Sequence, residues 1–174
     1  MQNQHDTAWL NGDDPGAARV CLEGVAESRV AIDRVIAAAR NTLSVFDACL
    51  ADPAWNNAER CALLKAFLLQ RRGNRLRCVL HQPDYLERDA PRLVTLLRQY
   101  SSCIEIRRTL GEARCASDPL LLADDHSYWH RLHIEHPRFV LALNNPVDAV
   151  LLSRRFEEIW ESSEPGWPPT TLGL

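Results

Sequence analysis

Two spacings of hydrophobic residues alternate along this chain. One repeats at every second position, as in a half-buried strand, and the other at every third or fourth position, as on one face of a helix. Taken in order, they predict strand and helix in turn over residues 19–107. The expected strands are 19–22, 42–46, 75–81 and 103–107, and the expected helices are 28–39, 57–71 and 89–100, the first of them capped by Ser28.

The last third of the chain has a different order. Residues 109–118 read as a loop, and three expected strands follow at 120–123, 126–133 and 138–143. A final helix begins at Asn145-Pro146 and runs to Trp160. Strands that alternate with helices favour a parallel arrangement covered on both sides. The pattern therefore predicts an α/β fold, with a mostly parallel mixed sheet and helices on both faces.

The two ends of the chain lack such periodicity. Residues 1–18 have few apolar positions and are interpreted as a flexible tail. Residues 163–174 include Pro165-Gly166-Trp167-Pro168-Pro169, which predicts a proline-rich tail without regular structure. One domain, 19–162, lies between them. A chain of 174 residues with 46% hydrophobic content suits one domain with a sizeable core.

Charge and composition narrow the function classes. The net charge is −3, from 20 basic and 23 acidic residues, which disfavours a protein that coats nucleic acid. The start has no basic, apolar secretory signal and no apolar run could span a bilayer, so we expect a cytoplasmic protein. None of the six cysteines form a C-x-x-C pair, so we interpret them as buried, reduced thiols rather than zinc ligands.

Three stretches together give a family resemblance. Residues 36–46 form a helix end followed by a strand, 120–125 an apolar strand ending in aspartate, and 145–160 a closing helix with Phe-x-x-x-Trp. Their order and spacing resemble one half domain of the phospholipase D superfamily, of the kind found in its small bacterial nucleases. The resemblance covers roughly residues 19–162 and implies the fold of that superfamily.

The superfamily's catalytic motif is H-x-K-x-x-x-x-D, and two copies meet where two half domains face each other. One histidine attacks phosphorus, the other protonates the leaving group, and the lysines bind phosphate oxygens. Asp124 matches the motif aspartate, but Ser117 stands at the histidine position and Pro119 at the lysine position. The resemblance therefore supports the fold and argues against the chemistry.

The alternative register leads to the same result. With Asp125 as the motif aspartate, Asp118 and Leu120 stand at the histidine and lysine positions. We assign no catalytic residue on this basis. The resemblance also implies a homodimer across the cleft, because half domains of the superfamily pair in that way.

Four of the six histidines fall within residues 126–136, close behind Asp124. On a strand, His126 and His130 would point to the same face. A carboxylate and two imidazoles suit zinc or manganese, which gives the hypothesis of a metal site from Asp124, His126 and His130. The plain alternative is a partly exposed strand with histidines at its surface, and we expect no cofactor or metal. His81, at the end of another expected strand, is interpreted as a structural residue.

Arginines form the second group of candidates. Arg107, Arg108 and Arg114 lie around the loop after one expected strand, and Arg131 and Arg138 lie on the strands that follow. A guanidinium presents a planar fork of donors that matches phosphate or carboxylate. In the resembling fold these segments surround the catalytic cleft. The functional interpretation is an anion pocket, and the plain one is solvated arginines paired with nearby glutamates.

Three hypotheses follow. In the first, a non-catalytic phospholipase D-like domain binds a phosphate-containing ligand in the altered cleft, through Arg108, Asp124, His126, His130 and Arg131. In the second, a hydrolase uses a remodelled site made of Asp124, His126 and His130, with or without a metal. In the third, the chain is a protein-interaction module.

Overall fold

The computed structural model describes residues 19–133 and 135–167. The expected tail 1–18 and the end 168–174 lie outside the described residues. Within these residues the strands are β1 Arg19–Glu23, β2 Thr42–Asp47, β3 Arg75–Leu80, β4 Ile104–Thr109, β5 Leu120–Ala123, β6 Ser127–Arg131, β7 Arg138–Ala142 and β8 Ser163–Trp167. The α-helices are α1 Val25–Ala38, α2 Ala58–Gln70, α3 Asp84–Asp89, α4 Pro91–Gln99 and α5 Pro146–Glu161. The 3-10 helices are η2 Pro53–Asn56, η3 Ser101–Cys103 and η4 Gly111–Cys115.

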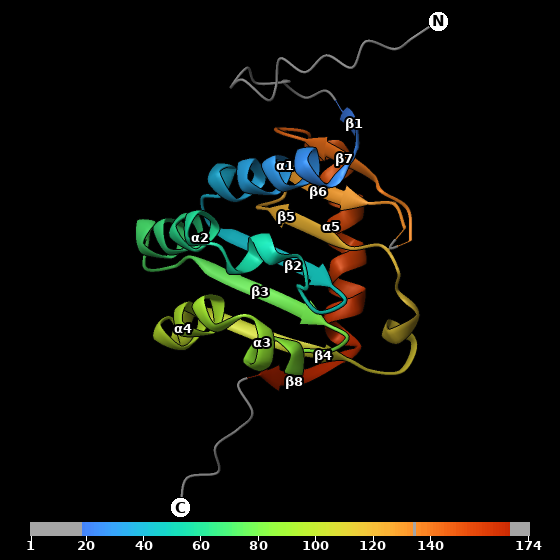
Figure 1. The fold of residues 1–174 in the computed structure, drawn as a ribbon. Coiled ribbons are helices and arrows are strands. Elements are labelled where there is room, and N and C mark those ends of the chain that lie inside the picture. Colours follow the sequence, from blue (N-terminus) through green and yellow to red (C-terminus); the bar gives the residue numbers. More distant parts are fainter. Residues whose placement is uncertain (1–18, 134, 168–174) are drawn as a thin grey trace, which may run out of the picture.

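All of these strands join one sheet, in the order β1-β7-β6-β5-β2-β3-β4-β8. Figure 1 shows α1, α2 and α4 over one face of this sheet and α5 across the other. The α/β class, the mixed sheet and the helices on both faces confirm the expected fold class. Among the described helices, none has both the length and the apolar character that crossing a bilayer requires.

The expectation that the sheet is mostly parallel is wrong. Only β2–β3 and β3–β4 are parallel, because only their connections hold crossover helices between neighbouring strands. The remaining pairs are antiparallel. Only residues 124–126 join β5 to β6, and 132–137 join β6 to β7. A parallel crossover needs about a dozen residues, so these short connections force hairpins.

The expected irregular tail is also wrong for residues 163–167. This segment is β8, an edge strand antiparallel to β4. Pro165 is tolerated there because an edge strand needs no donor on its outer side. Trp167 is buried, and its Nε1 donates to Oε1 of Glu87 over 2.8 Å. The folded domain therefore extends to residue 167 instead of ending at 162.

Two apolar clusters lie on opposite faces of the sheet, because successive strand residues point to opposite sides. One packs α1, α2 and α4 against residues such as Val45, Cys78 and Leu121. The other packs α5 against residues such as Phe46 and Tyr128. The expectation that the cysteines are buried holds fully for Cys78, whereas the other five cysteines have some exposure.

Side-chain caps confirm two of the predicted helix starts. Asn57 accepts a hydrogen bond from the N–H of Arg60 at the start of α2, and Asn145 accepts one from Asp148 at the start of α5. The predicted cap at Ser28 is wrong, because α1 already begins at Val25. Ser28 is buried inside α1, and its hydroxyl accepts a hydrogen bond from the indole of Trp129.

Candidate functional site

The C-terminal ends of the parallel strands β2, β3 and β4 meet at one edge of the molecule, which we call the cleft end. In α/β sheets this is the edge at which ligands bind. The antiparallel register brings the start of β5 to the same edge, because Phe46 pairs with Leu120. It also brings the end of β6 there, because Leu120 pairs with His130. Residues distant in the sequence therefore meet at the cleft end.

Asp118 is the centre of one polar cluster at the cleft end. Its Oδ1 lies 3.2 Å from a terminal nitrogen of Arg155 on α5, and its Oδ2 lies 3.6 Å from Nε2 of His130 on β6. Burial disfavours the carboxylate, but His130 and Arg155 outweigh that effect and lower the pKa of Asp118 to about 2. The cluster therefore holds an ionised carboxylate between β6 and α5.

Asp47, the last residue of β2, is a second acid at the cleft end. Its carboxylate accepts hydrogen bonds from the N–H groups of Cys49, at 3.0 Å, and Leu50, at 2.7 Å. Burial raises the pKa of Asp47, and these bonds and the positive charge of Arg131 only partly offset it. Arg131 thus lowers the pKa of Asp47 through its charge, although the two side chains form no direct ion pair.

His81 is a structural residue, as the sequence indicated. Its Nε2 lies 3.0 Å from the carbonyl oxygen of Ala116, and its Nδ1 lies 2.8 Å from the hydroxyl of Thr109. A carbonyl can only accept, so the ring proton belongs on Nε2 and Nδ1 accepts from Thr109. Both ring nitrogens are thus used to tie the end of β3 to β4 and to the segment before β5.

Arg131 immediately precedes the connection between β6 and β7, residues 132–137, which borders a cavity; Ile134 of this connection is outside the described residues. The Nε of Arg131 donates to the carbonyl oxygen of His136 over 3.0 Å, and its guanidinium lies 5.5 Å from the ring centre of Phe139. These contacts hold the side chain in place. The cavity has a volume of about 580 Å³ and is lined by Glu23, Leu132, His133, His136, Pro137 and Arg138.

The structure separates the five candidate ligand residues instead of bringing them together. Asp124 and His126 lie at the opposite end of the sheet, where β5 ends beside the start of β2. His126 is 3.5 Å from Asp124, whereas His130 is beside Asp118. Four residues along a strand span about 13 Å. In the described residues no group of three or more His, Cys, Asp or Glu side chains could hold a metal ion.

Asp124 has a structural role at that opposite end. It adopts a positive φ of 52°, and its carboxylate accepts N–H bonds from Arg40, Asn41 and Thr42 at 2.9, 2.8 and 2.9 Å. Burial opposes its charge, but these bonds outweigh burial and lower the pKa of Asp124. The residue ties the β5–β6 turn to the chain that enters β2.

Arg108 lies at the cleft end but is turned toward α3. A terminal nitrogen of its guanidinium lies 2.6 Å from Oδ2 of Asp84, the first residue of that helix. Of the five candidates, Arg108, His130 and Arg131 therefore share one end of the sheet. Arg108 and His130 each have an acidic partner, and Arg131 makes no ion pair within the described chain.

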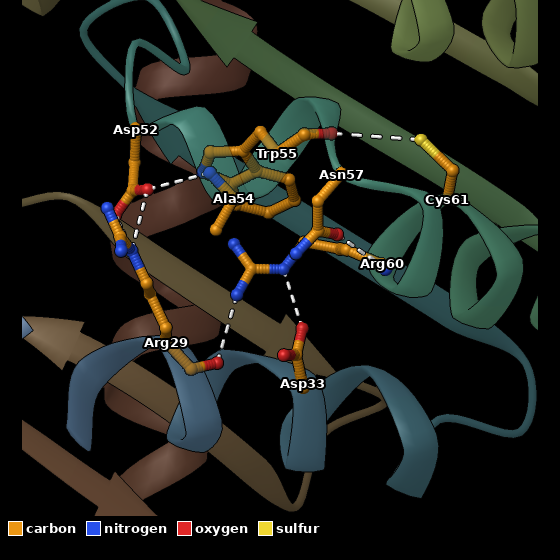
Figure 2. Close-up of polar contacts among 8 residues, drawn as sticks. All are labelled: Arg29, Asp33, Asp52, Ala54, Trp55, Asn57, Arg60 and Cys61. Carbon is orange, nitrogen blue, oxygen red and sulfur yellow. Dashed lines mark hydrogen bonds and ion pairs between the residues drawn. The ribbon is translucent and has the colours of Figure 1, made fainter. Parts of the chain in front are cut away.

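A buried network lies beside α1 and α2 (Figure 2). Arg60 has no exposed side-chain surface; its Nε donates to Asp33 over 2.6 Å and a terminal nitrogen donates to the carbonyl oxygen of Arg29 over 2.9 Å. Its guanidinium also lies 4.9 Å from the ring centre of Trp55. These contacts join α1, η2 and α2. The network has a structural role, because the Arg60 guanidinium does not reach the surface and cannot contact a ligand there.

Several residues of the cleft end were missed from the sequence. Asp47, Asp118 and Arg155 had no assigned role. The sequence did hold one signal for Asp47. An acid that ends a strand before a loop lies at the end of the sheet, where ligands bind in α/β folds. The contact between Asp118 and Arg155 joins residues 37 positions apart and depends on how α5 crosses the sheet.

The fold is that of a phospholipase D-like α/β domain. Nuc of Salmonella typhimurium, a phospholipase D family member, matches with a TM-score of 0.60 and 13% identity over 86% of this chain and 99% of that one. NucT of Helicobacter pylori matches with a TM-score of 0.54 and 11% identity over the same shares. The chain itself belongs to the family described as "Domain of unknown function (DUF7931)", whose model matches residues 25–167.

A third solved structure resembles the chain. TrmBL2, an archaeal chromatin protein whose structure shows a novel mode of DNA binding, matches with a TM-score of 0.64 and 14% identity. The match covers 92% of this chain but only 58% of that one. At these identities the likeness concerns the fold alone. No curated protein matches the sequence.

Proposed function

We propose that this chain is a non-hydrolytic phospholipase D-like domain that binds a phosphate-containing ligand at its cleft end. Arg131 carries the proposal. It adjoins Leu132 and donates to His136, two of the residues that line a cavity of about 580 Å³, and it forms no ion pair with a carboxylate of the described residues. A guanidinium held in this way presents its remaining donors as a planar fork that suits a phosphate group.

The absence of hydrolysis is proposed from the sequence at the start of β5. Ser117 and Pro119 occupy the positions at which the family motif has histidine and lysine. Pro119 is buried and offers neither a charge nor an N–H, and its carbonyl oxygen accepts the N–H of Arg131 over 2.8 Å. Without a nucleophile and an adjacent cation, the phosphoryl transition state has no stabilisation at these positions.

Ligand binding is tested with thermal melting and titration calorimetry of the full chain. The probes are inorganic phosphate, pyrophosphate and a short single-stranded DNA, with sulfate as the anion without phosphorus. A ligand that binds only the folded state raises the free energy of unfolding, by about 2.7 kcal/mol at a ligand concentration of 100 Kd, and therefore raises the Tm. The expected result is a shift with at least one phosphate-bearing probe that Arg131→Ala abolishes.

The matched control is Arg72→Ala, which removes an exposed arginine at the opposite end of the sheet. It should leave the shift intact. If Arg131→Ala shows the same Tm shift as the parent, or if no probe shifts the Tm of the parent, the proposed binding site is wrong. A DNA shift without a phosphate or pyrophosphate shift identifies a nucleic acid as the ligand.

The absence of hydrolysis has its own test. A chromogenic phosphodiester incubated with the protein should release product no faster than in buffer. Release that is lost in Ser117→Ala or His130→Ala would contradict the proposal and indicate an enzyme. The homodimer expected across the cleft also stays a prediction, and gel filtration of the full chain tests it, because a monomer at micromolar concentration would rule it out.

A further inference from the structure

The two edge strands of the sheet differ in how well they can accept another strand. β8 contains Pro165, which has no N–H, next to the charged Glu164. Proline and charge are devices that block pairing at sheet edges. β1, at the other edge, reads Arg-Val-Cys-Leu-Glu and has no proline. Figure 1 shows β1 at the margin of the sheet beside β7, its one neighbour among the described strands.

The direction of the backbone groups of β1 follows from one hydrogen bond. The N–H of Gly24 donates to the carbonyl oxygen of Pro137 over 3.4 Å, in register with the β1–β7 ladder. Backbone groups of successive strand residues point to alternate sides. Residues 20, 22 and 24 therefore point to β7, and Arg19, Cys21 and Glu23 present their N–H and C=O groups outward.

The sequence of β1 is complementary to that of a second β1 running in the opposite direction. Opposite charges, Arg19 and Glu23, stand at equal distances from Cys21, and the apolar Val20 and Leu22 stand between them. We infer that β1 pairs with β1 of a second copy of this chain, antiparallel and around a two-fold axis at Cys21. Arg19 then faces Glu23 of the second copy, Val20 faces Leu22, and the outward groups of the two Cys21 residues bond to each other.

The charges already present at this edge support the pairing. Arg19 lies 3.5 Å from Asp148, and Glu23 lies 3.5 Å from Arg138, and all four side chains keep at least 30% exposure. In the pair of copies, each interface charge gains a second neighbour of opposite sign. The result is a row in which acid and base alternate across the junction. Opposite charges directly across an antiparallel pair stabilise it, and like charges do the reverse.

The contact is expected to be weak and concentration-dependent. Five residues a side bury less surface than the interfaces of stable dimers. On the face toward α1, Leu22 is buried and Val20 is half-buried, so little apolar area is left to add. Most of the specificity then comes from the backbone bonds and from the two Arg19–Glu23 pairs.

Complementary charge reversal is the sharpest test, measured by sedimentation equilibrium of the full chain. Glu23→Arg places two arginines opposite each other, and Arg19→Glu places two glutamates opposite each other. Each variant alone should lose about tenfold or more in its association constant. An equimolar mixture of the two variants restores both opposite-charge pairs and should dimerise as the parent does. Failure of the mixture to associate would overturn the inference.

Cys21 gives two further readouts. Cys21→Pro removes the central outward N–H without removing a bond to β7, and it should prevent association, whereas Cys21→Ser should not. In a narrow antiparallel pair the Cα atoms are about 5.5 Å apart, within reach of a disulfide. Mild oxidation should therefore give a covalent dimer that Cys21→Ser abolishes and that Cys115→Ser, at the other exposed cysteine, retains.

Two other outcomes would each overturn the pairing. A chain that stays monomeric up to millimolar concentration excludes it, including the case in which residues before Arg19 occupy the edge themselves. A dimer that is indifferent to both the charge variants and Cys21→Pro lies elsewhere.

Discussion

The Nε of Arg60 donates to Oδ1 of Asp33 over 2.6 Å, and the two side chains differ sharply in exposure. Arg60 has none of its side chain exposed, whereas Asp33 keeps 33%. One terminal nitrogen of Arg60, Nη1, is buried without a partner in the described residues. The charge of Arg60 therefore depends on Asp33, on the carbonyl oxygen of Arg29 and on the face of Trp55 (Figure 2).

This asymmetry predicts that the exposed partner matters more than the buried one. Asp33→Ala leaves a buried guanidinium without its counter-charge and should lower the free energy of unfolding by about 2–3 kcal/mol. Arg60→Met removes the charge, keeps a long apolar stem beside Trp55 and leaves Asp33 to water, so we expect a cost of about 1 kcal/mol. Urea unfolding measures both, and the reverse order would contradict this account of the network.

Asp118 predicts an acid-sensitive contribution to stability. Its pKa of about 2 in the folded state is lower than in the unfolded chain, so the unfolded state binds the proton first as pH falls. The contribution is complete above about pH 4 and is lost as pH falls toward 2; it amounts to about 2 kcal/mol. Asp118→Asn should flatten this part of the pH profile of urea unfolding. Arg155→Met should shrink it, and a parent-like slope in Asp118→Asn would rule the assignment out.

Asp124 predicts a structural loss when its charge is removed. Asp124→Asn tolerates the positive φ but replaces a carboxylate that accepts three backbone N–H bonds. We expect a loss of about 1–3 kcal/mol and faster hydrogen exchange at Arg40, Asn41 and Thr42. Asp125→Asn, at the exposed next position, should change stability by less than about 0.5 kcal/mol. Equal costs for the two variants would refute the structural role.

Gly166 predicts a steric limit at the β8 edge. A Cβ at this position would lie 2.7 Å from the backbone nitrogen and 2.9 Å from the Cβ of Arg108. Gly166→Ala should push β8 away from β4, lower stability by about 1–3 kcal/mol and expose Trp167. Trp fluorescence and urea unfolding measure these effects. Gly73→Ala is the matched control, because nothing lies within 4 Å of its added Cβ, and it should be neutral or better.

The order of strands and helices could be predicted because hydrophobic periodicity follows from burial on one face. The direction of the strands after β4 was missed, although the short connections at 124–126 and 132–137 carried that information. β8 was missed because Pro165 argues against a strand in general. It does not do so at an edge, where the outer N–H is not needed.

The candidate site was harder to predict than the fold. Asp124 and His130 are close in sequence, but a strand between them carries them to opposite ends of the sheet. Spacing along the chain therefore suggested a cluster that the register does not form. The group that does form, Asp118 with His130 and Arg155, depends on the path of α5 across the sheet, which no local pattern encodes.

The strand order also constrains how the chain matures during synthesis. Of the described strands, β1 leaves the ribosome first, yet its neighbour β7 is completed only when Ala142 has been added. β2 likewise waits for β5 on one side. Until the second half emerges, the apolar faces of α1 and β1 stay uncovered, and such intermediates are prone to aggregate. A ribosome that stalls before β7 would therefore release a fragment that needs a chaperone, whereas one that stalls after α5 would release a nearly complete sheet.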